Sequence, residues 1–217
     1  MKISLLTLSL LLASIVLADE SRPPVKPVEL QLVASPSFEE PLDASFAVIQ
    51  GTWTAAGGVL TGSELPDDKH AAVLHHKVGL RTAVIECEFR LSGSPQFLVG
   101  CDGKGLVGRV VVKATGVDIA EDSAKPSKVI ATLKTPVALE QWHHLRVEWK
   151  ADEMIATLDD QTVSAKHPFF ATAKSRSWLA VPKAKTEIRK LAIRGEKIEP
   201  LRWARIYSIF RVGAALW

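Results

Sequence analysis

Two carboxylates, Glu86 and Glu88, have the spacing in this sequence that most directly suggests chemistry. They fall in a stretch, 82–91, where apolar and polar residues alternate, so we expect both side chains on one face of a β-strand, about 6.5 to 7 Å apart at Cα. Carboxyl groups so placed can approach the ~5.5 Å separation at which retaining glycosidases pair a general acid with a nucleophile. The competing interpretation is a solvated strand face, on which Arg90 moderates the repulsion between the two charges.

Cys87 and Cys101 are the two cysteines of the chain. If residues 92–95 form a turn, the strands on either side make a β-hairpin in which the two sulfurs lie nearly opposite on one face. A disulfide would then be within reach in an oxidising compartment, although direct cross-strand disulfides are geometrically demanding. Two buried free thiols are the equal alternative.

Three further residues are candidates for ligand binding. Trp178 could offer a flat apolar ring to a sugar, although packing in the core is the more common role for such a side chain. Asp102 follows directly on the second arm of the expected hairpin and could assist the two glutamates. One outward histidine, His76 or His144, could line a cleft, with an ordinary surface or turn role as the alternative.

Metal binding has little support in the sequence. The histidines of the neighbouring pairs at 75–76 and 143–144 point to opposite faces of predicted strands, so neither pair can supply two ligands to one ion. The aspartate pairs at 67–68 and 159–160 could hold calcium through oxygen ligands, but neither shows a full ligand loop, and turn roles are the default. We therefore expect no cofactor and no metal site, with calcium left open.

The first 18 residues have the features of a secretory signal peptide: Lys2, an apolar run over 5–17, and small residues before the expected cleavage site. The run is shorter than the ~20 residues of a membrane span, and no cysteine lies near residue 18. We expect an exported protein, periplasmic or extracellular, that is neither a lipoprotein nor a transmembrane protein. Residues 19–28 are predicted to be a flexible leader, 29–198 one domain and 199–217 a C-terminal extension.

Charge excludes one class of partner. The chain carries 27 Lys and Arg residues against 24 Asp and Glu residues, without a long basic run. Neutralising a phosphate backbone needs a concentrated basic surface, so no nucleic-acid partner is expected. The sequence leaves the oligomeric state open.

The positioning elements are short strands. Period-two alternation recurs in brief segments separated by glycine, proline or aspartate, and no amphipathic helix is evident before residue 200. This pattern predicts two packed antiparallel sheets, a β-sandwich or jelly roll. We expect strands at 29–33, 46–49, two within 51–60 joined by a Gly57-Gly58 turn, 71–76, 82–91, 96–102, 109–113, 117–119, 129–133, 143–150, 154–158, 162–163, 178–181 and 188–193.

A series of short motifs follows the same order along the chain. They are Gly51-x-Trp53 with Gly58-Val-Leu60, Ile85-x-Cys-x-Phe89-Arg-Leu, Gln141-Trp142-His-x-Leu145-x-Val147, Ala156-x-Leu158-Asp159 and Ile188-x-x-Leu191-x-Ile193. This series resembles the concanavalin A-like lectin/glucanase fold and, more narrowly, is similar to the bacterial 3-keto-disaccharide hydrolase domain family, over roughly residues 36 to 195. The resemblance implies an all-β, two-sheet antiparallel jelly-roll sandwich, in which Trp53, Trp142 and Trp149 pack in the core.

The chain also departs from these relatives. Glucanases of this fold carry Glu-x-Asp-x-x-Glu or a shortened form of it, whereas Glu86-x-Glu88 is followed here by Phe89-Arg90 without a third carboxylate. Ser92-Gly-Ser-Pro95 replaces the Asn-Ser-Gly that is typical of the hydrolase family. We therefore expect a carbohydrate-interacting, lectin-like or structural module without catalysis, whose partner is a glycan or small saccharide. The alternative is a glycoside hydrolase of the 3-keto-disaccharide hydrolase or glucanase type that uses Glu86 and Glu88.

Overall fold

The computed structural model describes residues 30–198, so the predicted signal peptide, leader and C-terminal extension lie outside the described residues. Within this range the chain forms fourteen strands and one 3₁₀ helix, η1 (Pro168–Ala171). The strands are β1 (Gln31–Ala34), β2 (Phe46–Gln50), β3 (Thr52–Ala56), β4 (Val59–Ser63), β5 (Ala72–Ser92), β6 (Gln96–Asp102), β7 (Leu106–Lys113), β8 (Gly116–Glu121), β9 (Lys128–Lys134), β10 (His143–Lys150), β11 (Glu153–Leu158), β12 (Gln161–Lys166), β13 (Lys174–Val181) and β14 (Lys185–Lys197).

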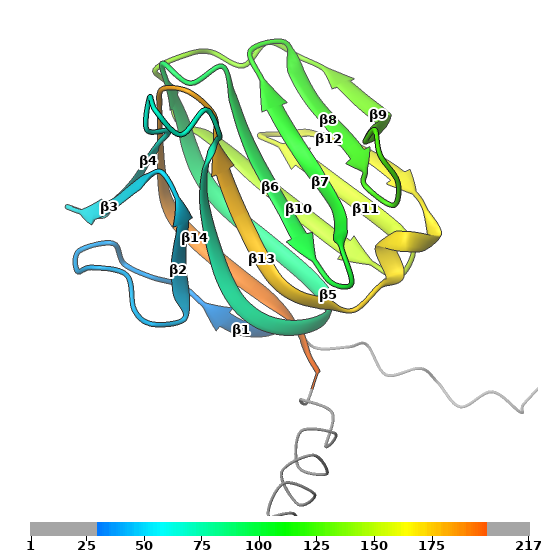
Figure 1. Ribbon diagram of the computed structural model, residues 1–217. Coiled ribbons are helices and arrows are strands. Elements are labelled where there is room, and N and C mark those ends of the chain that lie inside the picture. Colours follow the sequence, from blue (N-terminus) through cyan, green and yellow to red (C-terminus); the bar gives the residue numbers. More distant parts are fainter. Residues whose placement is uncertain (1–29, 199–217) are drawn as a thin grey trace, which may run out of the picture.

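Strand β5 joins two antiparallel layers. Its first half pairs with β2 and β13, and the order β2-β5-β13-β6-β7-β8-β9 makes the layer that we name sheet I. Its second half pairs with β10 and β14, and these strands with β11, β12, β1, β4 and β3 make sheet II. Figure 1 shows β5 curving around one end of the molecule between the two layers. The predicted all-β jelly-roll sandwich is confirmed.

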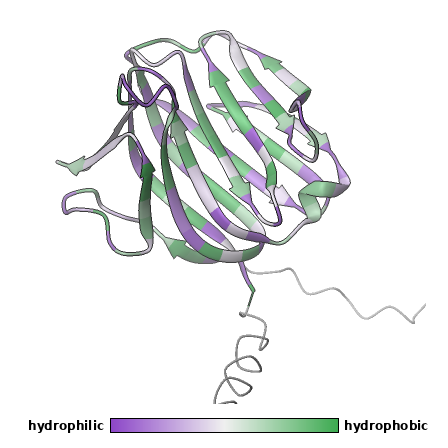
Figure 2. Cartoon of the chain, viewed as in Figure 1, coloured by the Kyte–Doolittle hydropathy of each residue, from purple (hydrophilic) through white to green (hydrophobic). Residues whose placement is uncertain are grey.

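The core lies between the sheets and follows the alternation of the sequence. In the second half of β5 the predicted buried face is confirmed: Ile85, Cys87 and Phe89 are at most 2% exposed. The ring of Phe89 meets that of Phe97 on β6 in the facing sheet, with 5.3 Å between ring centroids. Figure 2 shows the matching alternation of apolar and polar residues along the strands.

The predicted hairpin over 82–102 is wrong. The second half of β5 lies in sheet II and β6 lies in sheet I, so the segment between them crosses from one layer to the other. Ser94 fixes this crossing: its N–H donates to the backbone oxygen of Lys185 (3.2 Å) and its hydroxyl to that of Pro182 (2.7 Å). Period-two patterning could not reveal this, because strands that face each other across a sandwich carry the same alternation as strands paired within one sheet.

Because of this crossing, the two cysteines lie in strands of different sheets. Cys87 is opposite Leu145 on β10, and Cys101 is opposite Ser177 on β13. Both are buried free thiols in the structure. Burial raises the pKa of Cys87 to about 12, so this thiol stays protonated at neutral pH.

The predicted strand positions are otherwise close to the observed ones. The turn at Gly57-Gly58 joins β3 to β4 as expected. The segments predicted separately at 71–76 and 82–91 are one continuous strand, β5. In the described part of the chain no helix is long and apolar enough to cross a membrane.

Candidate functional site

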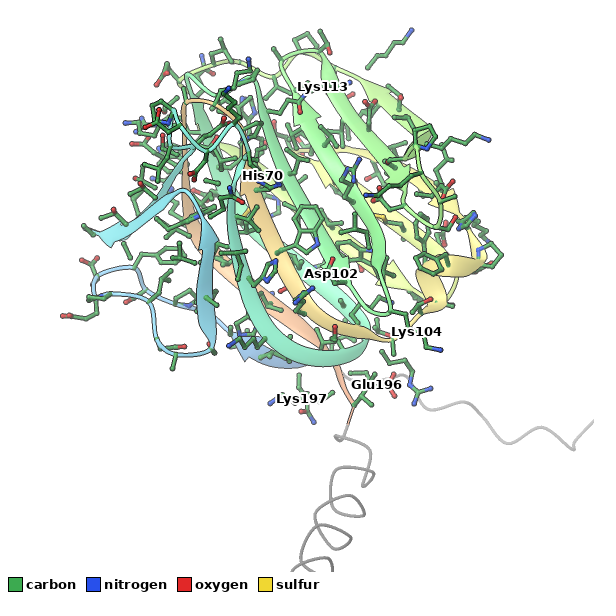
Figure 3. The ribbon with its side chains drawn as sticks, viewed as in Figure 1. His70, Asp102, Lys104, Lys113, Glu196 and Lys197 are labelled. Atoms are coloured by element: carbon green, nitrogen blue, oxygen red, sulfur yellow. The ribbon has the colours of Figure 1, made fainter. Side chains whose placement is uncertain are left out.

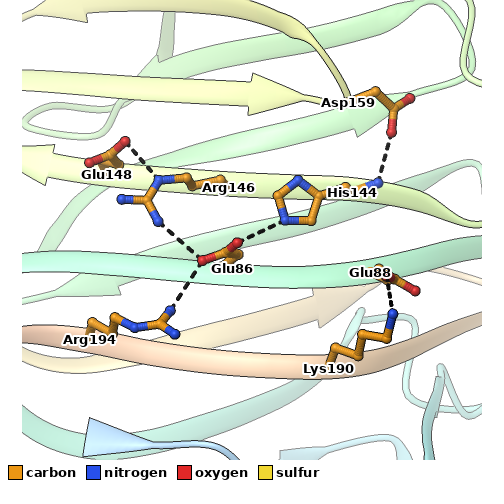
Figure 4. A network of polar contacts seen from close by, with 8 residues as sticks. All are labelled: Glu86, Glu88, His144, Arg146, Glu148, Asp159, Lys190 and Arg194. Carbon is orange, nitrogen blue, oxygen red and sulfur yellow. Dashed lines mark hydrogen bonds and ion pairs between the residues drawn. The ribbon is translucent and has the colours of Figure 1, made fainter. Parts of the chain in front are cut away.

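Glu86 is at the centre of a polar network on the outer face of sheet II. Its neighbours come from the strands on either side of β5, as Figure 4 shows. The Oε1 atom lies 3.0 Å from Nε2 of His144 on β10. The Oε2 atom accepts hydrogen bonds from Nη1 of Arg146 on β10 and Nη1 of Arg194 on β14, each at 3.1 Å. Three strands are therefore joined through one carboxylate.

Glu88, two residues along β5, is held by two successive residues of β14. Arg189 donates through Nε to Oε2 (2.5 Å), and Lys190 donates through Nζ to Oε1 (2.7 Å). Successive side chains of a regular strand point to opposite faces. Here the register shifts between Arg189 and Ala192, and Lys190 has φ 52°. This irregularity in β14 is what brings both cations to the same carboxylate.

These side chains border a groove of about 410 Å³. Its size falls within the range of ~300 to 1,000 Å³ that is common for ligand sites. The side chains of Glu86 and Glu88 are 29% and 20% exposed, whereas that of Lys190 is 70% exposed. The carboxylates thus lie lower in the groove than the lysine. The lining residues are Ser35, Glu86, Cys87, Glu88, His144, Lys190, Ala192 and Arg194.

Both carboxylates are ionised at neutral pH. Burial acts to raise the pKa of Glu86, but the hydrogen bond with His144 and the charges of Arg146 and Arg194 hold it below its usual value. The hydrogen bond from Lys190, together with Arg189, likewise lowers the pKa of Glu88 against a smaller effect of burial. A glycosidase acid needs a raised pKa so that it can deliver a proton near neutral pH. Neither glutamate has one.

Trp142 lies beside this network, and its predicted place in the core is wrong. The side chain is half-buried and lies against two guanidinium groups, with the Cζ of Arg189 4.1 Å and that of Arg90 5.0 Å from the ring centroid. Trp149 is fully buried as predicted, and Trp53 packs against the core from a partly buried position. The alternation that fits Trp149 does not extend to Trp142, because residue 142 precedes β10.

Trp178 and Asp102 meet on the other outer face, that of sheet I. Because Leu179 and Val181 of β13 point into the core, Trp178 points outward, and its Nε1 donates to Oδ1 of Asp102 (2.9 Å). Arg176 donates to the second oxygen of Asp102 (2.6 Å). Figure 3 labels Asp102 on this face. Trp178 is only 8% exposed, so it offers little surface to a stacked sugar ring.

The structure therefore divides the predicted site residues between two faces. Glu86, Glu88 and His144 come together on sheet II, whereas Trp178 and Asp102 come together on sheet I. Sequence reasoning missed the three cations that β14 supplies. The signal for two of them was the basic pair at 189–190, whose direction depends on the irregularity in β14, and the signal for Arg194 was its alternation with the core residue Ile193.

The aspartate pairs serve as turn residues. One oxygen of Asp159 accepts from the backbone N–H of His144 (2.8 Å), and the other lies 2.8 Å from Nδ1 of His143. The backbone N–H of Asp68 donates to the oxygen of Leu65 in the loop before β5. Between residues 30 and 198, no group of three or more His, Cys, Asp or Glu side chains is arranged to hold a metal ion.

Comparison with known proteins addresses the fold. No family model matches the sequence, and no curated protein sequence is similar to it. Among solved structures, SCLam, a non-specific endo-β-1,3(4)-glucanase of family GH16, has a TM-score of 0.55 at 14% identity, covering 81% of this chain and 95% of that chain.

Two carbohydrate-binding modules are also similar in structure. The CBM66 module from Bacillus subtilis has a TM-score of 0.51 at 16% identity, covering 70% of this chain and 93% of that chain. The CBM2 module of the evolved Dit of Lactobacillus casei BL23 phage J-1 has a TM-score of 0.57 at 7% identity, covering 79% of this chain and 99% of that chain. The chain therefore has the concanavalin A-like jelly-roll fold that its sequence motifs resemble.

Proposed function

We propose that this protein is a carbohydrate-binding β-sandwich module that holds a glycan or small saccharide in the groove over Glu86 and Glu88. The observation that carries the proposal is the groove itself, in which carboxylates, cations and a histidine converge on one open face. A sugar presents hydroxyl groups that donate as well as accept hydrogen bonds. Carboxylate oxygens and the N–H groups of Arg194 and Lys190 together meet both needs.

The groove is proposed to bind the saccharide and release it without cleaving it. Glu86 and Glu88 are both held as anions by neighbouring cations, so no protonated carboxyl group is ready to protonate a leaving oxygen. The fold is shared by carbohydrate-binding modules and by a glucanase, and it does not decide between binding and hydrolysis.

A glycoside hydrolase of the 3-keto-disaccharide hydrolase or glucanase type is the second candidate. It is favoured by the presence of two carboxylates on one face inside a groove. In this alternative Glu86 and Glu88 serve as acid/base and partner carboxylate. Binding of substrate would then have to raise the pKa of one of them, for example by displacing Lys190 from Glu88.

Export to the periplasm or the extracellular space, without lipid attachment, stays part of the proposal. It rests on the predicted signal peptide at 1–18. The mass of the mature protein checks it: cleavage after residue 18 is expected, and retention of the intact N-terminus in the cell would contradict it.

One panel of neutral and charged oligosaccharides and 3-keto-glycosides tests both candidates. Isothermal titration calorimetry is expected to find binding to at least one saccharide, weakened tenfold or more in Arg194→Gln, with no sugar released by wild type. Arg81→Gln is the matched control, because Arg81 is an exposed arginine of β5 outside the groove. Sugar release by wild type that is lost in Glu86→Gln and Glu88→Gln would establish the hydrolase instead. Absence of binding to the whole panel would refute the proposed function.

A further inference from the structure

We infer that the groove over Glu86 and Glu88 selects an acidic saccharide, one that carries carboxylate or sulfate groups. This inference rests on the proposed function and specifies its ligand class. It follows from which charges in the groove are exposed, which hydrogen-bonding groups are already used, and how many cations contact each glutamate.

Exposure differs between the two signs of charge. The side chains of Glu86 and Glu88 are the less exposed ones, whereas Lys190 and Arg194 are 70% and 39% exposed. A ligand entering the groove therefore meets cationic nitrogen atoms before it meets carboxylate oxygens. Figure 4 shows the two cations of β14 reaching across to the carboxylates of β5.

The hydrogen-bonding groups of the carboxylates are largely occupied. Both oxygens of Glu86 and both oxygens of Glu88 already accept from neighbouring side chains. Arg194 uses one nitrogen, Nη1, for Glu86, although a guanidinium carries five N–H donors. Lys190 has three donors and directs one at Glu88. The groups left for a ligand are mainly donors, which match the acceptor oxygens of carboxylate or sulfate.

Each glutamate of the groove is contacted by two cationic side chains. Glu86 and Glu88 are contacted by four permanently cationic side chains, and Glu148 adds one more carboxylate through its ion pair with Arg146. Asp159, which accepts a hydrogen bond from the backbone N–H of His144, is a fourth carboxylate, so what distinguishes the groove is the greater exposure of its cations. The cationic side chains are Arg146, Arg189, Lys190 and Arg194.

A neutral sugar could use the same donors, but it would gain nothing from the charges of the exposed Lys190 and Arg194. For an acidic sugar, each partly exposed pair of opposite charges adds a modest and salt-dependent gain. The inference therefore predicts selectivity between two ligands that differ only in charge, and a loss of that selectivity at high ionic strength.

The test uses matched saccharides. An oligogalacturonate tetramer is compared by calorimetry with the same tetramer after its carboxyl groups are reduced to alcohols, and a chondroitin sulfate tetramer with its desulfated form. We expect at least one acidic member to bind tenfold or more tightly than its neutral counterpart, and this ratio to fall several-fold between 50 and 500 mM NaCl. The pair that shows the effect identifies carboxylate or sulfate as the recognised group.

Variants complete the experiment. Lys190→Gln is expected to reduce the preference for the acidic sugar at least threefold. Lys69→Gln is expected to leave the preference unchanged, because Lys69 is also an exposed lysine with positive φ but lies in the loop before β5. Equal binding of acidic and neutral members would overturn the inference and leave the proposed function standing. Binding of neither, here and in the wider panel, would remove both.

Discussion

The indole of Trp178 lies against Gly100 on the neighbouring strand so closely that a Cβ on residue 100 would be 2.2 Å from the Cζ2 atom of the ring. A side chain at residue 100 would force the indole away from Asp102, with which it is hydrogen bonded. Gly100→Ala is therefore expected to lower the free energy of unfolding by about 1 to 3 kcal/mol, the usual cost of overpacking.

Chemical denaturation of Gly100→Ala and Gly105→Ala measures this contact. Gly105 is the control, since a Cβ there would meet nothing within 4 Å. Its substitution is expected to change stability by no more than about 0.5 kcal/mol. Similar losses of unfolding free energy in the two variants would show that contact with the Trp178 ring is not the cause of the effect at residue 100.

The burial of Lys174 is expected to make the free energy of unfolding depend on pH in the alkaline range. Its ammonium group is buried and donates to the backbone oxygens of Arg81 (2.9 Å) and Phe170 (2.8 Å). Burial lowers the pKa of Lys174 to about 8, below its ordinary value in the unfolded chain. Between pH 8 and about 10.5 the unfolded state then binds more protons, so the contribution of this group to stability rises with pH, by up to roughly 3 kcal/mol.

The comparison that isolates this effect is wild type against Lys174→Met over pH 7 to 10.5. The difference in the free energy of unfolding between the two is expected to shift in favour of wild type as pH rises. Both proteins carry the two cysteines, whose thiols ionise in this range only in the unfolded chain. A difference that stays constant with pH would contradict the lowered pKa of Lys174.

Acid is expected to act through the two glutamates of the groove. The pKa values of Glu86 and Glu88 are lowered in the folded state, so their stabilising contribution is present above the ordinary value of 4.5 and is lost as pH falls through the folded values. The double variant Glu86→Gln/Glu88→Gln should therefore lose less stability than wild type between pH 5 and 2. Thermal unfolding followed by circular dichroism measures this, and parallel curves for the two proteins would refute the account.

The cysteines give a simple chemical prediction. Cys87 and Cys101 are buried free thiols, and burial raises the pKa of both. A thiol reagent is expected to label neither residue in the native protein and both after unfolding in denaturant without reductant. Failure to detect thiols until a reductant is added would reveal a disulfide and require the two sheets to approach differently near these residues.

Much of the fold could be predicted from the sequence because alternating apolar and polar residues indicate which face of a β-strand is buried. Ile85, Cys87 and Phe89 alternate with Glu86 and Glu88, and this pattern correctly predicts both the core face and the outer face of β5. Alternation does not say which strand lies alongside. The pairing of β5 with β10 and β14 depends on residues about 60 and 100 positions away in the chain, so the hairpin prediction failed.

The site was predicted only in part for a related reason. The shared face of Glu86 and Glu88 follows from local spacing, and His144 was recognised as an outward residue. The contribution of β14 depends on the irregularity around Lys190, which lets Arg189 and Lys190 reach one carboxylate. The burial of Trp178 depends on Gly100 in a neighbouring strand. Neither the irregularity in β14 nor this contact produces a pattern that can be recognised in the local sequence.

The central claim is that a saccharide binds on the outer face of sheet II, over Glu86 and Glu88, and not over Trp178 on sheet I. Titration of ¹⁵N-labelled protein with a saccharide that binds, followed by NMR, tests this most directly. The account predicts shifts of the backbone amides of Glu86, Glu88, His144 and Lys190, with the indole N–H signal of Trp178 unchanged. Shifts confined to Trp178 and to residues 98–102, with the groove amides unaffected, would contradict it.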